Sequence, residues 1–224
     1  MLSSIMIVII RKENTLRYFT SDVHFMHPFV AALRGYTNKE WTDYSPQELR
    51  ELAREHDAKL NDYVNVREHD DWILDMINST MSVKDSIYIL GDFSSGSTLS
   101  TIRAVEEFNH IKVPRSHRHL ILGNHDNLKH NHTNMLRLLD AFGDVSMNGF
   151  VTIGGVNLLM SHFQFRKHFE VGTHDGTLST NYDAVKYIRY APVDDGHTLL
   201  LHGHTHATTP FEFDDPSELN VGVD

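Results

Sequence analysis

Five short polar clusters each follow directly after an apolar run, and this pattern constrains the fold more than any other feature of the chain. The runs are Leu16–Thr20, Ile87–Leu90, Leu120–Leu122, Val156–Met160 and Leu199–Leu201, and the clusters are Asp22-Val23-His24, Gly91-Asp92, Gly123-Asn124-His125-Asp126, Ser161-His162 and Gly203-His204-Thr205-His206. A strand that ends in oxygen- and nitrogen-bearing side chains points them at one edge of its sheet. Five such ends predict one shared polar site, with the residue types of a two-metal centre.

Strand and helix signals alternate early in the chain, and hairpins dominate late. We expect strands at Ser3–Ile10, Leu16–Ser21, Ser86–Leu90, His119–Leu122, Phe150–Ile153, Val156–Met160, Thr198–Leu201 and Leu219–Val223. Helices are expected over Glu68–Asn78, Thr98–Asn109 and Asn134–Phe142, and from a capping box at Ser45 with apolar spacing as far as Val64. Gly154-Gly155 predicts a two-residue hairpin turn. The order of elements predicts an α/β fold with a mixed sheet.

The stretch 163–197 is long and polar with little periodicity, and we interpret it as an active-site flap or insertion. The chain of 224 residues fits a single domain over residues 1–224. Its formal net charge of −10 argues against a broad grip on duplex nucleic acid. Cysteine is absent, which excludes disulfides and thiolate metal sites and fits a cytoplasmic protein. The apolar run Ile5–Ile10 is too short to span a membrane.

The ordered set of polar clusters resembles the calcineurin-like metallophosphoesterase superfamily, and the matching segments run from Asp22 to His206. The segment from Phe19 to Phe25 and the terminal Asn220–Asp224 are similar to compact bacterial and bacteriophage members. Since such relatives run on further, we expect a short C-terminal end beyond Asp224. The resemblance implies a two-sheet mixed β-sandwich flanked by α-helices, with a dimetal site at the C-terminal ends of the strands. The run Gly91–Gly96 lacks a further Asp or Arg, which argues against the Ser/Thr protein phosphatases.

The resemblance also implies the metal ligands. Asp92 would bridge two divalent cations; Asp22, His24 and His206 would complete the first set, and Asn124, His162 and His204 the second. Alternate residues of an extended segment point the same way, which would bring Asp22 beside His24 and His204 beside His206. The adjacent Gly91, Gly123 and Gly203 would permit close backbone approach. Ligands of nitrogen and oxygen suit Mn²⁺, Fe²⁺, Zn²⁺ or Ni²⁺, and the resemblance favours Mn²⁺.

In the chemistry that the resemblance implies, a metal-bridging hydroxide attacks phosphorus and His125 protonates the leaving group. Asp126 would orient the His125 imidazole and favour its charged form. His27 and Arg166, with Lys167, are candidates for substrate binding. Phe163, Phe165 and Tyr182 are candidates for stacking on a nucleobase, with core packing as the alternative for each.

These features predict a hydrolase of phosphate esters, with a phosphodiesterase on small substrates such as 2′,3′- or 3′,5′-cyclic nucleotides as the first expectation. The absence of a basic groove favours small molecules over nucleic acid, and no membrane partner is expected. A phosphomonoesterase and a metal-dependent nuclease are the alternatives with the same chemistry. A non-catalytic scaffold is the alternative from another class. The oligomeric state stays open.

Overall fold

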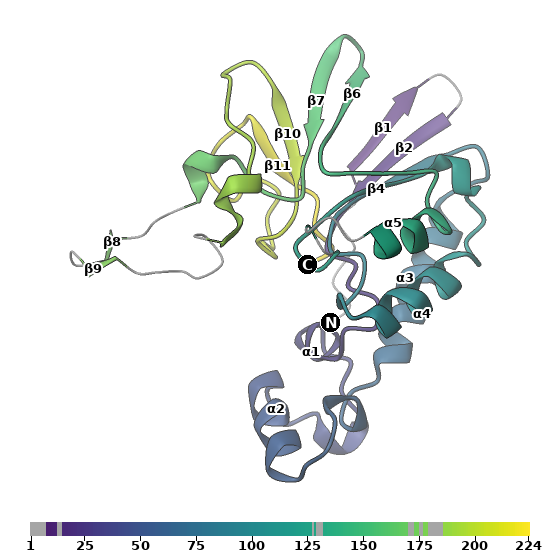
Figure 1. Ribbon diagram of the computed structural model, residues 1–224, viewed down its shortest axis with the longest axis vertical. Helices are drawn as coiled ribbons and strands as arrows, with labels where there is room; N and C mark the ends of the chain where they lie inside the picture. Colours follow the sequence, from purple (N-terminus) through teal and green to yellow (C-terminus); the bar gives the residue numbers. More distant parts are fainter. Residues whose placement is uncertain are drawn as a thin grey trace.

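Two β-sheets pack against each other in the computed structural model, which describes residues 8–12, 15–126, 128, 132–169, 173–174, 177–178 and 186–224 (Figure 1). The first sheet has the order β1-β2-β3-β4-β5, formed by Val8–Lys12, Thr15–Thr20, Ser86–Leu90, Arg118–Ile121 and Asp144–Ser146. Strands β2 to β5 are parallel, and β1 is antiparallel to β2. The second sheet has the order β11-β10-β7-β6, formed by Glu218–Asn220, Leu199–His202, Val156–Met160 and Gly149–Ile153.

A layer of apolar side chains fills the space between the two sheets. Phe19, Leu90 and Ile121 point into it from the first sheet, and Leu158 and Leu201 from the second. These residues come from strands whose neighbouring positions face the other way, as the two-residue period of a strand requires. The two-sheet mixed α/β fold predicted from the sequence is therefore confirmed.

Three helices cover the other face of the first sheet (Figure 1). They are α3 (Val66–Thr80), α4 (Thr98–Phe108) and α5 (His132–Leu139). Side chains at helical spacing, such as Ile73 and Ile77 of α3, pack in one buried cluster with Ile87 and Ile89 of β3. Helix α3 begins at Val66, two positions before the expected start, because the side chain of its cap Asn65 accepts the N–H of Glu68.

Helices α1 (Pro28–Leu33) and α2 (Pro46–Glu55), with the short turns η1 (Lys39–Trp41) and η2 (Leu60–Asp62), form a helical lobe beside the sandwich (Figure 1). The lobe, residues 28–62, has a buried cluster of its own that includes Ala31 and Leu49. The capping box predicted at Ser45 is present, since Ser45 and Glu48 exchange side-chain and backbone hydrogen bonds. Helix α1 was not predicted.

The expected continuation of α2 to Val64 is wrong. The helix ends at Glu55 because Asp57 takes a left-handed conformation, with φ of 50°, and the N–H of Ala58 returns to the carbonyl of Ala53 at 2.8 Å. This is the hydrogen bond of a Schellman cap, which stops a helix whatever the apolar spacing beyond it.

The remaining strand predictions hold with shifts of one or two residues at element ends, except that β11 ends at Asn220 and not at the expected Val223. Gly154 and Gly155 have φ of 59° and 84°, as a two-residue hairpin turn between β6 and β7 requires. The predicted first strand is seen from Val8 onward, and its earlier part lies outside the described residues. The predicted flap contains η4 (Arg166–His168), the strand pair β8 (Thr173–His174) and β9 (Thr177–Leu178), and η5 (Ile188–Tyr190). Within the described part of the chain, no helix has the length and apolar character needed to cross a bilayer.

Candidate metal centre

The five polar clusters gather where strands of the two sheets end. Asp22, Asp92 and Asn124 lie just after β2, β3 and β4, and His162 and His204 just after β7 and β10. Because β2, β3 and β4 are parallel to one another, as are β7 and β10, the clusters of each sheet lie at one edge. Contacts join the two edges: His162 Nδ1 lies 2.8 Å from the carbonyl oxygen of Leu90. The predicted convergence is therefore present.

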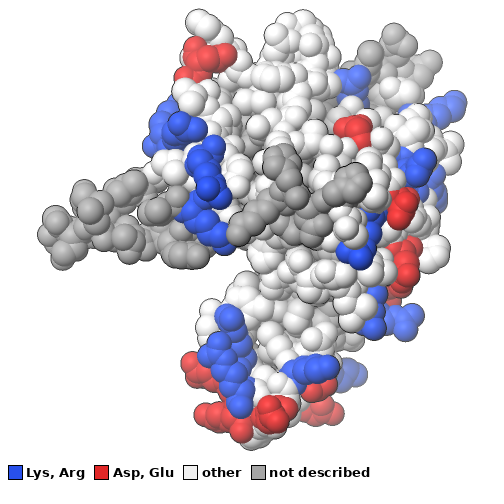
Figure 2. All heavy atoms as spheres, viewed as in Figure 1, with Lys and Arg blue, Asp and Glu red and all other residues white. Residues whose placement is uncertain are grey.

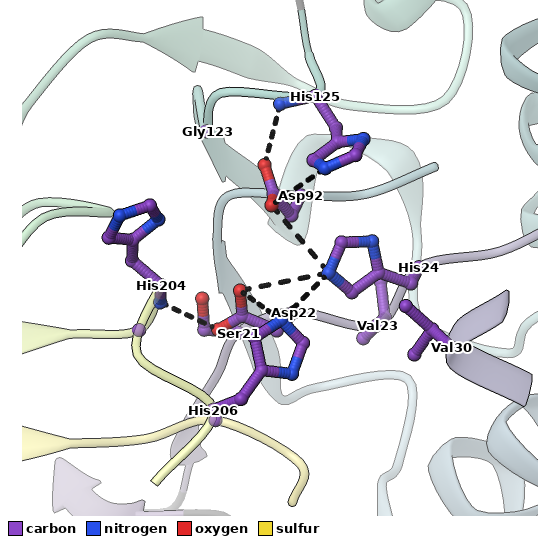
Figure 3. Close-up of polar contacts among 12 residues, drawn as sticks. Ser21, Asp22, Val23, His24, Val30, Asp92, Gly123, His125, His204 and His206 are labelled. Atoms are coloured by element: carbon purple, nitrogen blue, oxygen red, sulfur yellow. Dashed lines mark hydrogen bonds and ion pairs between the residues drawn. The ribbon is translucent and has the colours of Figure 1, made fainter. Parts of the chain in front are cut away.

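A first group of ligand atoms consists of Asp22 Oδ1, His24 Nε2 and His206 Nε2, which all lie within 4.8 Å of one another (Figure 3). The two Nε2 atoms are 3.2 Å apart, and Asp22 Oδ1 lies 4.0 Å from that of His24 and 3.8 Å from that of His206. Asp22 Oδ1 is buried and has no hydrogen-bond partner among the described residues. A buried carboxylate oxygen left without a donor, facing two imidazole nitrogens, fits a divalent cation.

The Asp92 carboxylate lies between this group and a second one. Its Oδ2 is 3.6 Å from His24 Nε2, and its Oδ1 is 3.5 Å from His162 Nε2. Asn124 Oδ1 adds an oxygen to the second group, 2.9 Å from His162 Nε2. One oxygen of Asp92 thus faces each group, which is the placement expected of a bridging carboxylate.

His204 is the most loosely placed of the seven proposed ligands. Its imidazole lies beside that of His162, with ring centroids 5.1 Å apart. Its backbone N–H donates to Asp22 Oδ2 at 3.0 Å, so the loop that carries it is held against the first group (Figure 3). These two contacts hold His204 beside the other candidate ligands. Its ring nitrogens are not in any of the groups whose ligand atoms lie within 4.8 Å of one another.

Five of the candidate ligand residues have a left-handed backbone, whereas the sequence predicted extended segments. The alternation of side chains along an extended segment is therefore not what brings them together. Asp22, His24, Asp92, His204 and His206 have φ of 57°, 50°, 52°, 72° and 53°. For residues with a Cβ this conformation costs about 1–2 kcal/mol each, and such strain gathers at functional sites. Alternate left-handed residues, Asp22 and His24 in one loop and His204 and His206 in another, curl these loops instead of extending them.

The three glycines beside the ligands are needed for close approach, as predicted. A Cβ at Gly203 would lie 2.2 Å from Asp22 Oδ2, and one at Gly123 would lie 2.3 Å from Asp92 Oδ1. A Cβ at Gly91 would lie 2.4 Å from His162 Nδ1. The Asp22, Asp92 and His162 side chains are buried, so any larger residue at one of these glycines would displace one of them.

Two histidines of the centre, His24 and His204, are held in the form that binds cations. Burial, reinforced by the neighbouring imidazoles, lowers the pKa of His24 and of His204 well below the usual range. Both rings are therefore neutral at pH 7 and carry a free lone pair. Burial also raises the pKa of Asp92, because a carboxylate away from water needs a compensating positive charge.

A family model for the calcineurin-like phosphoesterase superfamily domain matches residues 68–223. The chain belongs to this superfamily. Two phage proteins are similar to it: the Gene 66 protein of Mycobacterium phage L5 is 29% identical over 201 residues, covering 85% of this chain and 77% of that protein. The Gene 66 protein of Mycobacterium phage D29 is 26% identical over 217 residues, covering 92% and 87%. These relatives agree with the resemblance to compact bacteriophage members.

A solved structure shares the fold. The protein of unknown function AQ665 from Aquifex aeolicus aligns with a TM-score of 0.50 at 20% identity, over 87% of this chain and 81% of that chain. The calcineurin-like phosphoesterases hydrolyse phosphate esters with divalent metals, and the Asp and His groups described above are of the kind that holds them.

In this phosphoesterase His125 lies beside Asp92. Its Nε2 is 4.0 Å from Asp92 Oδ2, and its backbone N–H donates to Asp92 Oδ1 at 2.8 Å. The opposite ring nitrogen, Nδ1, lies 3.3 Å from the carbonyl oxygen of Ser95. The imidazole is about one-third exposed (35%), so Nε2 can reach a bound substrate.

The expected role of Asp126 in orienting His125 is wrong. Both of its carboxylate oxygens accept backbone N–H groups, from Phe93 at 3.0 Å and from Gly123 at 2.9 Å. The buried carboxylate therefore ties the loop after β3 to the loop after β4, and Ser95 takes the orienting position beside the imidazole. Burial, together with the charge of Asp92, raises the pKa of Asp126 to about 7.

The candidate substrate residues divide into those near the centre and those away from it. The His27 ring lies 5.1 Å from that of His24 and 5.3 Å from that of His125. Arg166 instead donates to the carbonyl of Ala191, and Lys167 pairs with Asp194 and Asp215. Phe163 and Phe165 are buried, so packing and not base stacking is their role, and Tyr182 lies outside the described residues.

Two cavities adjoin the centre, and sequence reasoning missed most of their walls. The η5 cavity, about 380 Å³, is lined by Asn124 and His125 and by Lys186, Tyr187, Arg189 and Tyr190. The lobe cavity, about 890 Å³, is lined by His24, His125 and His206 and by Phe29, Leu33 and Arg50. Among the described residues His125 is the one that lines both. The other wall residues named here, from the segment 186–190 and from α1 and α2, belong to no motif, so only the fold reveals them.

Asp224 and Arg34 support the candidate ligand His206. Asp224 Oδ2 accepts a hydrogen bond from His206 Nδ1 at 2.6 Å, which directs Nε2 toward Asp22. Arg34 donates to both oxygens of Asp224, at 2.8 and 3.0 Å, and to the carbonyl of Asp22 at 2.8 Å. The pair therefore fixes the orientation of one ligand and the loop of another.

Replacing Asp224 with Asn is expected to weaken divalent metal binding about 10- to 100-fold, as the loss of a partner of a ligating His does. The amide removes the charge that favours His206 as a ligand, and its single oxygen can replace only one of the two contacts that Asp224 makes with Arg34. Competition with a chromogenic chelator measures the affinity. Asp214→Asn is the matched control, because Asp214 is exposed and lies in the same C-terminal segment. Equal affinities for the two variants would contradict the assigned role of Asp224.

Proposed function

We propose that this protein is a phosphodiesterase that uses two divalent cations, with Mn²⁺ as the first choice, and acts on small nucleotide substrates in the cytoplasm. The observation that carries the proposal is the Asp92 carboxylate between two ligand groups, with two cavities that both adjoin His125. Asp22, His24 and His206 would hold one cation with Asp92, and Asn124, His162 and His204 the other. Bound divalent cations lower the pKa of coordinated water and draw charge from phosphoryl oxygens.

His125 is proposed to protonate the leaving group. Its contact with the carbonyl of Ser95 supports a proton on Nδ1, which leaves Nε2 directed at the centre. When the ring is charged, Nε2 also carries a proton and can donate it to a departing alkoxide. His27 is proposed to line the wall where substrate enters.

A diester is favoured over a monoester because the centre has room for two substituents. A monoester carries one organic group and would leave one of the cavities empty. Cyclic nucleotides, expected from the family resemblance, are diesters too, and their single nucleoside would fill one of the two cavities. The formal net charge of −10 argues against duplex nucleic acid as the substrate.

Diester preference is tested with bis-p-nitrophenyl phosphate and p-nitrophenyl phosphate, each with Mn²⁺, Ni²⁺, Zn²⁺ and Fe²⁺. We expect kcat/KM to be at least about tenfold higher for the diester, a difference of about 1.4 kcal/mol in activation free energy. Treatment with a chelator should abolish both activities. A preference for p-nitrophenyl phosphate would favour a phosphomonoesterase, and cleavage of single-stranded DNA or RNA a nuclease. Background activity with every metal would favour a non-catalytic scaffold.

A further inference from the structure

The lobe cavity has the walls of a binding site for an organic group. We propose that Phe29, Leu33 and Arg50 form a second substrate subsite, which binds one nucleoside of a linear phosphodiester while the η5 cavity binds the other. The substrate class is then a compound of two nucleosides joined by one phosphate. This inference rests on the proposed function and specifies its substrate.

The first support is the continuity between the lobe cavity and the centre. The cavity wall includes His24 and His206 of the first ligand group and runs from there to α1 and α2. Leu33 is a large apolar side chain that is 54% exposed, and it lies in this wall. An apolar surface beside a reactive centre, in a concave site, is typical of ligand binding.

The second support is the pairing of a ring with a cation. The Arg50 guanidinium lies over the Phe29 ring, 5.3 Å from its centroid. This arrangement offers an aromatic face for a base and a positive charge for a phosphate or a sugar hydroxyl. Asp224, the acidic residue in the same wall, already pairs with Arg34 and His206. Arg50 therefore gives this wall a positive charge, although the net charge of the chain is −10.

The η5 cavity, which His125 also lines, again pairs aromatic rings with cations. Lys186 lies over the Tyr187 ring at 4.5 Å, and Arg189 lies over the Tyr190 ring at 4.8 Å. Figure 2 shows Lys and Arg side chains gathered on the side of the body that carries η4 and η5, and others on the helical lobe. Both cavities combine aromatic rings with cations, and His125 lines both. They therefore match a phosphodiester that carries one nucleoside on each ester oxygen. A cyclic nucleotide has one nucleoside and would fill one cavity.

The test compares Arg50→Ala with Arg54→Ala on two substrates, uridylyl-3′,5′-adenosine and 2′,3′-cyclic AMP. Arg54 is the matched control because it is an exposed residue of the same helix and lines neither cavity. We expect Arg50→Ala to lower kcat/KM for the dinucleoside about tenfold, mainly through KM, because a bound base loses part of its stacking platform. The value for the cyclic nucleotide should stay unchanged, as should both values for Arg54→Ala. Arg50→Lys, which keeps the charge, should recover part of the loss.

Because Arg50 is exposed, its replacement is not expected to affect folding, and the melting temperature verifies this. Equal losses on both substrates, or no loss on the dinucleoside, would overturn the second subsite. A wild-type protein that hydrolyses the cyclic nucleotide but not the dinucleoside would overturn it too, while leaving the proposed function intact. Failure of the wild type on every diester, including bis-p-nitrophenyl phosphate, would overturn both proposals.

Discussion

Replacing His125 with Asn is expected to leave both metals in place and to lower kcat at least about a hundredfold, the usual contribution of a general acid. The Asn side chain matches the part of the imidazole nearest the backbone in size, but its amide cannot act as a general acid. The backbone N–H that binds Asp92 is unaffected by the substitution, so the centre should keep its shape. Turnover of 2′,3′-cyclic AMP, with metal content measured on the same sample, provides the test.

The leaving group separates proton donation from a structural role. p-Nitrophenolate departs without a proton, so the loss for bis-p-nitrophenyl phosphate should be much smaller than the loss for the cyclic nucleotide. A structural defect would lower both rates alike. His110→Asn serves as the control, since His110 is an exposed residue at the end of α4. An unchanged rate for His125→Asn would remove this residue from the mechanism.

The double variant Asp92→Asn/His204→Asn is expected to retain no metal and to show background activity. The first substitution removes the carboxylate that faces both ligand groups, and the second removes an imidazole of the second set. Wild-type protein that is stripped with a chelator and reconstituted should hold about two ions per chain. Metal analysis after gel filtration gives both numbers.

Folding should survive this double substitution. The Asp92 carboxylate is buried, and its neutral amide relieves the cost of a charge away from water. The metal-free variant should therefore melt no lower than metal-free wild type, as measured by circular dichroism. Stoichiometric metal in the double variant would refute the ligand assignment. A lower melting temperature would show that the metal loss comes from misfolding.

The position of the site could be predicted from sequence because it follows from topology. Parallel strands end at one edge, so polar residues after each strand must meet there, and Asp22 and Asp92 do. The glycines beside the ligands were predictable for the same reason, since Gly91 and Gly203 lie where loops approach each other closely. Local signals such as the capping box at Ser45 were also reliable, because they depend on residues three positions apart.

Other features were not predictable because they depend on contacts between distant residues. The pair of Arg34 and Asp224 joins positions 190 apart in the sequence. Asp126 lies next to His125 in the chain, yet its carboxylate points to the backbone of Phe93. The end of α2 depends on one left-handed residue, Asp57, which apolar spacing does not reveal. The walls of the lobe cavity exist only once the helical lobe has packed against the sandwich.

The left-handed backbone at Asp22, His24, Asp92, His204 and His206 has a consequence for protein engineering. Transplanting these side chains onto another scaffold in ordinary strand or helix geometry would aim them in different directions, even with every residue type preserved. A graft has to carry the whole loops, with their glycines. Within the native chain, Asn is the replacement that best tolerates this backbone, so combinatorial libraries at these five positions should sample Asn first.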